Sequence, residues 1–126
     1  MKSVFIEATK SSPEIDFNLE TNTLKISGQS YPENAMKFYN PIFIWLDEYL
    51  KDIKEEVLVE IKIIYLNTSS SKCMFDIFEK LNNAYLNGVL IKLYWYYKDG
   101  NRNMMECGEE LVEDVDFPFE IISFNN

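Results

Sequence analysis

The chain has 126 residues, of which 47% are hydrophobic and 15% aromatic, with only four glycines and four prolines. A chain of this size and composition folds as one domain with a substantial core, so we expect residues 1–126 to form a single domain. The formal charge is −9, from 21 acidic and 12 basic residues. Such a surface repels phosphate backbones and anionic lipids, which argues against nucleic acid or a membrane surface as the main partner.

Residue usage also argues against most enzyme classes. The chain has no histidine, which removes Ser-His-Asp and Cys-His catalysis and most zinc sites. It has no glycine-rich phosphate-binding loop, and Cys73 and Cys107 do not form a CxxC pair. We therefore expect no catalytic activity, cofactor or metal. No signal peptide or long apolar span is evident, so the expected compartment is the cytoplasm, without membrane insertion.

Three strands are predicted in the first third of the chain. Residues 4–8 form a short apolar-rich run, and residues 14–20 and 23–27 alternate apolar and polar side chains. Thr21 and Asn22, which separate the last two runs, favour a tight hairpin turn.

A helix is predicted next, starting at the motif Ser-Tyr-Pro-Glu-Asn that begins at Ser30. Ser30 suits the capping position, Pro32 suits the first helical position, and Glu33 completes a capping box. A broad apolar face then extends from Met36 to Leu50. Pro41 lies inside this run and removes one helical hydrogen bond, which predicts a kink or a break.

The second half of the chain alternates strands and helices. Strands are predicted at residues 56–66, 89–97 and 119–124, and helices at residues 69–87 and 104–115. This alternation implies parallel crossovers, and charged residues on the strands leave one sheet face partly open to water. The expected fold class is therefore α/β, with a mixed sheet of about six strands and three helices mainly on one face. The predicted order is β-β-β-α-β-α-β-α-β.

The most informative segment is a polar turn between the strand at 56–66 and the helix that follows it. It holds five consecutive short polar side chains, Asn67, Thr68, Ser69, Ser70 and Ser71. Thr68 or Ser69 is expected to cap the helix, and the other residues are not needed for that purpose. A helix N-terminus also stabilises a phosphate on a nearby hydroxyl, and Lys72 adds a positive charge. Ordinary capping and a phosphorylation switch are thus both open.

The strand, polar turn and helix resemble anti-sigma-factor antagonist (STAS) domains, whose switch residue lies in an Asp-Ser-Ser/Thr-Gly turn at this place. Here Asn67 replaces the Asp, Thr68 the phosphorylated Ser, and Ser70 the Gly. A closer resemblance, over nearly the whole chain, is to the SiaC-type regulatory phosphoproteins. It is carried by four fragments in order, SYPEN (30–34), YLNTSS (65–70), WYY (95–97) and FPF (117–119).

This resemblance implies a bacterial, non-enzymatic partner-switching protein with a STAS-like fold. SiaC-like proteins are phosphorylated on the threonine of the Asn-Thr-Ser turn by a partner-switching kinase, and a PP2C-like phosphatase removes the phosphate. The unmodified form binds and activates a diguanylate cyclase, which raises cyclic di-GMP and promotes aggregation or biofilm growth. Thr68 is the implied phospho-acceptor. Partner contacts are expected around it, at Asn67, Ser69, Ser70, Lys72, Tyr31 and Asn34.

Two other functions stay open on the sequence. The first is an anti-sigma-factor antagonist, which acts on transcription by binding another regulatory protein. A small carboxylate enzyme or a ligand carrier is the remaining alternative. Its support is the acidic run at residues 109–116, which is equally typical of a solvated helix face.

Overall fold

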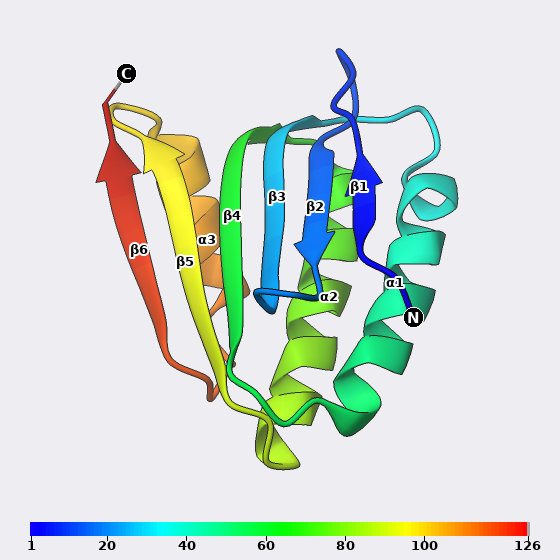
Figure 1. Cartoon of the computed structure of the whole chain (residues 1–126). Helices are drawn as coiled ribbons and strands as arrows, with labels where there is room; N and C mark the ends of the chain where they lie inside the picture. Colours follow the sequence, from blue (N-terminus) through cyan, green and yellow to red (C-terminus); the bar gives the residue numbers. More distant parts are fainter. Residues whose placement is uncertain (126) are drawn as a thin grey trace.

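A single six-stranded sheet carries three helices on one face, with the other face uncovered (Figure 1). The structure is a computed structural model that describes residues 1–125. In chain order the elements are β1 (Val4–Ile6), β2 (Glu14–Asn18), β3 (Thr23–Ser30), α1 (Ala35–Asp52), β4 (Val57–Leu66), α2 (Thr68–Leu86), β5 (Ile91–Lys98), α3 (Arg102–Leu111) and β6 (Phe119–Phe124). The predicted fold class and element order are confirmed.

The strands lie side by side in the order in which they occur in the chain. β1, β2 and β3 pair antiparallel, whereas β3, β4, β5 and β6 pair parallel. One helix connects each pair of neighbouring parallel strands, because parallel pairing requires a crossover connection. The N-termini of all three helices therefore lie at the same end of the sheet, beyond the carboxyl ends of β3, β4 and β5 (Figure 1).

β4 shows the alternation that separates the two sheet faces. Its odd-numbered residues from Val57 to Ile63 are buried under the helices. On the other face Lys62 is exposed and Glu60 is half-buried, and Glu60 pairs with Lys25 of β3 at 3.8 Å. The prediction that one face meets water is thus confirmed by the position of these charges.

α3 packs unusually closely on the sheet through a glycine. Trp95 of β5 is fully buried, and its indole Nε1 donates a hydrogen bond of 2.9 Å to the carbonyl of Met104. The ring lies directly against Gly108, where an added Cβ would be 2.5 Å from Trp95 Cδ1. The absence of a side chain at Gly108 is what allows this approach.

The structure corrects the predicted start of the first helix. Ser30 is the last residue of β3 and pairs with Leu66 of β4, so it does not cap the helix. The cap is Asn34, whose Oδ1 accepts a hydrogen bond of 3.0 Å from the Lys37 amide. The capping box of Ser30, Pro32 and Glu33 was therefore wrong. Strand pairing to β4 outweighs the local capping pattern, and it also extends β3 past the predicted end at residue 27.

The structure also bears on the predictions for Pro41 and for the third helix, and at Pro41 it excludes the break. α1 runs without a break through Pro41, so the loss of one amide donor is tolerated in a helix whose buried face packs on the sheet. α3 begins at Arg102 and ends at Leu111, whereas the sequence predicted residues 104–115. The side chain of Asn101 caps it by accepting a hydrogen bond of 3.2 Å from the Met104 amide.

Candidate switch site at the start of helix α2

Asn67 is the residue that caps α2, so the prediction of Thr68 or Ser69 as the cap was wrong. Its Oδ1 accepts a hydrogen bond of 2.8 Å from the Ser70 amide, and its carbonyl accepts one of 2.9 Å from the Ser71 amide. Its own amide donates to the Ser30 carbonyl at 3.0 Å. Asn67 thus fixes the turn to β3 and satisfies two of the amides at the helix start.

Capping by Asn67 leaves the two hydroxyls that follow it uncommitted. Thr68 is the first residue of α2, and both Thr68 and Ser69 are exposed. Within residues 1–125, no hydrogen bond engages either hydroxyl. The amides of the first helical turn have no partner inside the helix, and those of Thr68 and Ser69 are not taken up by the cap. An exposed hydroxyl therefore stands beside amides that still have hydrogen bonds to donate.

Ser70 lies below the turn and not on the surface. It is fully buried, with 0% of its surface exposed, and its Oγ accepts a hydrogen bond of 2.8 Å from Ser30 Oγ. Ser30 Oγ is in turn 2.7 Å from the hydroxyl of Tyr39 in α1. In this position Ser70 offers no surface to a partner, contrary to its predicted role as a contact residue. It instead ties the start of α2 to β3 and α1.

The environment of this relay of hydroxyls keeps it neutral. Burial raises the pKa of Tyr39 to about 12, although its hydrogen bond to Ser30 acts in the opposite direction. The phenol therefore stays protonated at physiological pH, with a proton to donate to Ser30. In the part of the chain described, no buried side-chain nitrogen or oxygen lacks a hydrogen-bond partner. The hydroxyls of the relay thus all have hydrogen-bond partners, and the relay supports the exposed turn from below.

Two lysines and two helix N-termini lie near the turn, although the chain as a whole is acidic. Neither α1 nor α2 has an acidic residue in its first turn, which leaves the positive ends of their dipoles without an acid inside the helix, and Glu33 lies directly before the α1 cap. Lys72 follows Thr68 by four residues, and both are exposed, which places them as neighbours on the helix surface. Lys37 occupies the corresponding region of α1. Among the described residues no ion pair engages Lys37 or Lys72.

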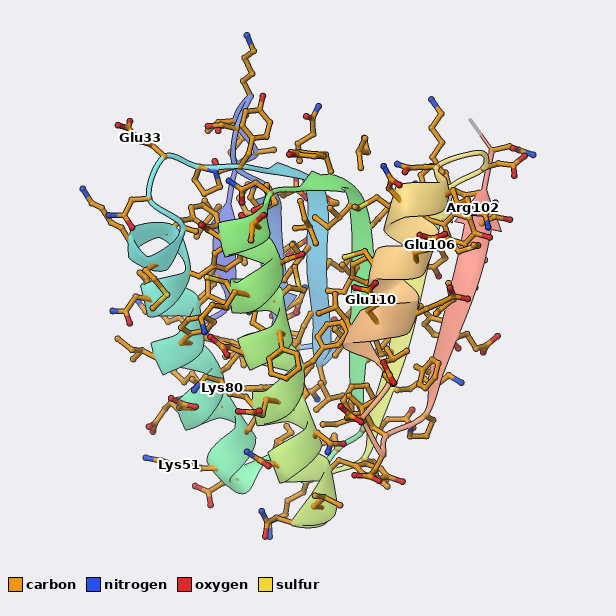
Figure 2. The ribbon with its side chains drawn as sticks, turned by 180° about the vertical axis from the view of Figure 1, so that it is seen from behind. Glu33, Lys51, Lys80, Arg102, Glu106 and Glu110 are labelled. Atoms are coloured by element: carbon orange, nitrogen blue, oxygen red, sulfur yellow. The ribbon has the colours of Figure 1, made fainter. Side chains whose placement is uncertain are left out.

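The start of α3 and the middle of α2 differ in this respect. Arg102 at the start of α3 pairs with Glu106 at 2.9 Å, and Figure 2 shows the two residues on that helix. Farther along α2, Lys80 pairs with Asp47 of α1 at 2.7 Å. Lys37 and Lys72, at the N-terminal ends of α1 and α2, have no such ion pair among the described residues.

A groove of about 970 Å³ lies between the N-terminal ends of α1 and α2. It is lined by Ile6 of β1, by Glu33, Asn34, Ala35, Met36, Lys37 and Phe38 at the start of α1, and by Ser69, Lys72 and Cys73 of α2. Cys73 is buried, and its thiol is 3.8 Å from the sulfur of Met36. Burial raises the pKa of the Cys73 thiol, which favours the uncharged form.

The structure brings together some of the residues predicted as partner contacts. Asn34, Ser69 and Lys72 all line the groove. Tyr31 lies outside it and packs its ring edge-on against Tyr65 at the end of β4, with ring centroids 6.0 Å apart. Lys37 was not predicted to be a contact residue. Met36 was predicted to lie on the apolar face of a helix, but 54% of its surface is exposed. The signal for both was their position in the first turn after the Asn34 cap.

Comparison with known proteins identifies the relatives of this fold and turn. Residues 6–124 match the SiaC family of regulatory phosphoproteins. The chain belongs to the SiaC family. Its likeness to an uncharacterised protein of Pseudomonas aeruginosa is 35% identity over 121 residues, which covers 96% of each chain.

Solved structures of SiaC family members show the same fold. SiaC of Pseudomonas aeruginosa matches with a TM-score of 0.90 and 32% identity, covering 98% of this chain and 100% of that chain. A crystal structure of the diguanylate cyclase SiaD in complex with its activator SiaC, from the same organism, gives a TM-score of 0.91 and 34% identity. That match covers 96% of this chain and 99% of the other. The SiaC of that organism thus acts by binding an enzyme.

No helix among residues 1–125 is long and apolar enough to cross a membrane. Within the same residues, no group of three or more cysteine or carboxylate side chains is placed to hold a metal ion. Glu109, Glu110, Glu113, Asp114 and Asp116 are all exposed.

Proposed function

We propose that this SiaC family member is a non-catalytic partner-switching protein whose unmodified form binds and activates a diguanylate cyclase. Phosphorylation of Thr68 is the proposed switch that ends this binding. The observation that supports it best is the exposed, uncommitted hydroxyl of Thr68, held at the start of α2 by a neighbour that already supplies the cap. The cyclase as target is supported by the SiaD–SiaC complex, whose chain matches this one at 34% identity.

A phosphate on Thr68 would find a favourable place without any rearrangement of the turn. It carries about 1.5 to 2 negative charges and three acceptor oxygens. The N-terminal amides of α2 can donate to those oxygens, and the dipole of the helix favours the charge. Lys72 lies one turn on and has no ion pair among the described residues. Phosphorylation would therefore convert a positive corner of the surface into a negative one.

The proposed cycle needs three partners. A cognate kinase transfers the phosphate to Thr68, a PP2C-like phosphatase removes it, and the cyclase binds the unmodified form. Asn67, Ser69, Lys72, Tyr31 and Asn34 are the surface residues proposed to meet these partners, because all five are exposed or half-buried near Thr68 or on the adjacent groove.

The experiment is to map phosphorylation by mass spectrometry on protein isolated from its own cells, with and without phosphatase treatment. We expect one phosphate on Thr68 that the phosphatase removes. Thr68→Ala should prevent it, whereas the matched control Ser69→Ala, a neighbouring exposed hydroxyl, should leave it in place. The switch would be refuted if the protein carried no phosphate on Thr68 under any growth condition. It would also be refuted if Thr68→Ala were phosphorylated to the same extent as the wild type, at another residue.

A further inference from the structure

The groove between the starts of α1 and α2 has an apolar floor and a positive rim. Ala35, Met36 and Phe38 supply apolar surface from α1, and Ile6 supplies it from the edge strand β1. Met36 is more than half exposed, with 54% of its surface open to solvent. Methionine is flexible and polarisable, so it adapts well to apolar side chains of a partner. Ile6 and Phe38 are half-buried and Ala35 is buried, so Met36 is the most open part of this apolar surface.

The charges of the rim select the kind of segment that fits it. Lys37 and Lys72 face the groove from opposite helices, and neither is paired with a carboxylate in the described chain. Two helix N-termini add to the positive potential, with no acidic residue in either first turn. Glu33 is the one acidic residue of the rim, and Figure 2 shows it on the loop before α1, on the side away from α2. In a chain of net charge −9, the rim of this groove holds two lysines and one carboxylate.

We infer that the groove binds a segment of the target protein that presents apolar side chains flanked by at least one carboxylate. The apolar side chains would lie on Met36, Phe38 and Ile6, and the carboxylate would lie between Lys37 and Lys72. A basic segment would meet like charges at the rim, and a purely apolar one would leave both lysines unpaired. This inference rests on the proposed function, since it names the chemistry of the surface that the target uses.

The same charges explain how a phosphate on Thr68 would control the groove without entering it. Thr68 is not among the lining residues, whereas its neighbours Ser69 and Lys72 are. A phosphate on Thr68 would draw Lys72 to itself, four residues along the same helix, and would set about two negative charges beside the incoming carboxylate. The two anions compete for one cation, and the loss of target binding follows.

The test is to measure the affinity of the unmodified protein for the full-length cyclase from the same cells, comparing charge reversals at the rim with one far from it. Lys37→Glu and Lys72→Glu should each weaken binding by about tenfold or more and reduce its dependence on salt. Met36→Glu should weaken it comparably. The control is Lys54→Glu, the same charge change at the other end of α1, which should stay within about twofold of the wild type.

Loss of folding does not account for the expected result. Glu at residue 37 would stand three residues after the Asn34 cap, and Glu at residue 72 would lie near the positive end of α2, both favourable places for an acid. Unchanged or tighter binding by both reversals would overturn the assignment of the groove while leaving the proposed function intact. Failure of the wild-type protein to bind the cyclase would overturn the proposed function, and the inference with it.

Discussion

The relay of hydroxyls beneath Thr68 makes a graded prediction about stability. Ser30 Oγ stands between Tyr39, whose hydroxyl is 2.7 Å away, and Ser70, whose Oγ is 2.8 Å away. All three residues have 0% of their surface exposed, so water cannot replace a lost partner. Removing one end, as in Ser70→Ala or Tyr39→Phe, deletes one hydrogen bond and should lower the free energy of unfolding by about 1 kcal/mol.

Removal of the middle residue should cost more. Ser30→Ala deletes both of these hydrogen bonds and leaves the buried hydroxyls of Tyr39 and Ser70 without their shared partner, so we expect a loss of about 2–4 kcal/mol. Urea denaturation at neutral pH measures all three variants, with slopes compared to verify two-state unfolding. Ser71→Ala is the matched control, because Ser71 is only part-buried and its one side-chain contact is a weak one of 3.8 Å to Cys107.

The result that would refute this reasoning is a Ser30→Ala variant no less stable than Ser70→Ala and Tyr39→Phe. The three hydroxyls would then contribute separately to stability, and the relay would not connect the turn at Thr68 to α1. A gain in stability in any of the three would have the same meaning, since it would show that the buried polar groups are poorly satisfied.

Three further predictions follow from contacts described above. Asn67→Ala should lower the free energy of unfolding by about 1 kcal/mol, because the Ser70 amide loses its acceptor, and thermal unfolding would show it. Gly108→Ala should cost about 1–3 kcal/mol, since its Cβ would lie 2.5 Å from Trp95 Cδ1; a variant as stable as wild type would refute that packing. Burial raises the pKa of Tyr39 from 10.0 to about 12 in the folded protein, so the unfolded chain loses this proton first as pH rises. Stability should therefore hold below pH 10 and fall between pH 10 and 12, and Tyr39→Phe should flatten that fall in a pH series of denaturation curves.

The fold was predictable because hydrophobic periodicity and chain order carry most of its information. Alternation along β4 separates the covered face from the open one, and the apolar stripe of α2 follows helical spacing, with Met74, Ile77, Phe78 and Leu81 all buried. The alternation of strands and helices then leaves little choice but parallel crossovers. These signals are local and repeated, so an error at one residue does not change the result.

The details of the site were less predictable because they depend on tertiary contacts. Ser30 is of a residue type that often caps helices, yet its pairing with Leu66 makes it the end of a strand. That pairing carries Ser30 next to Ser70, forty residues away, and explains why Ser70 is buried among polar neighbours. Sequence spacing placed Thr68 correctly at the start of the helix, but it did not distinguish Asn67 from Thr68 as the cap.

The groove was missed for a related reason. Helical periodicity assigned Met36 to an apolar face, but it does not say whether another element covers that face. β1 has only three residues, and Met36 in the first turn of α1 remains more than half exposed. Lys37 and Lys72 are far apart in the chain and become neighbours of one groove only through the packing of α1 beside α2.

The central claim is that phosphate on Thr68 decides whether the protein activates its target. The most direct measurement is the rate of cyclic di-GMP synthesis by the purified cyclase, with added protein that is unmodified, phosphorylated on Thr68, or phosphorylated and then treated with phosphatase. The account predicts activation by the first, little by the second, and recovery with the third. Equal activation by the unmodified and the Thr68-phosphorylated protein would contradict it.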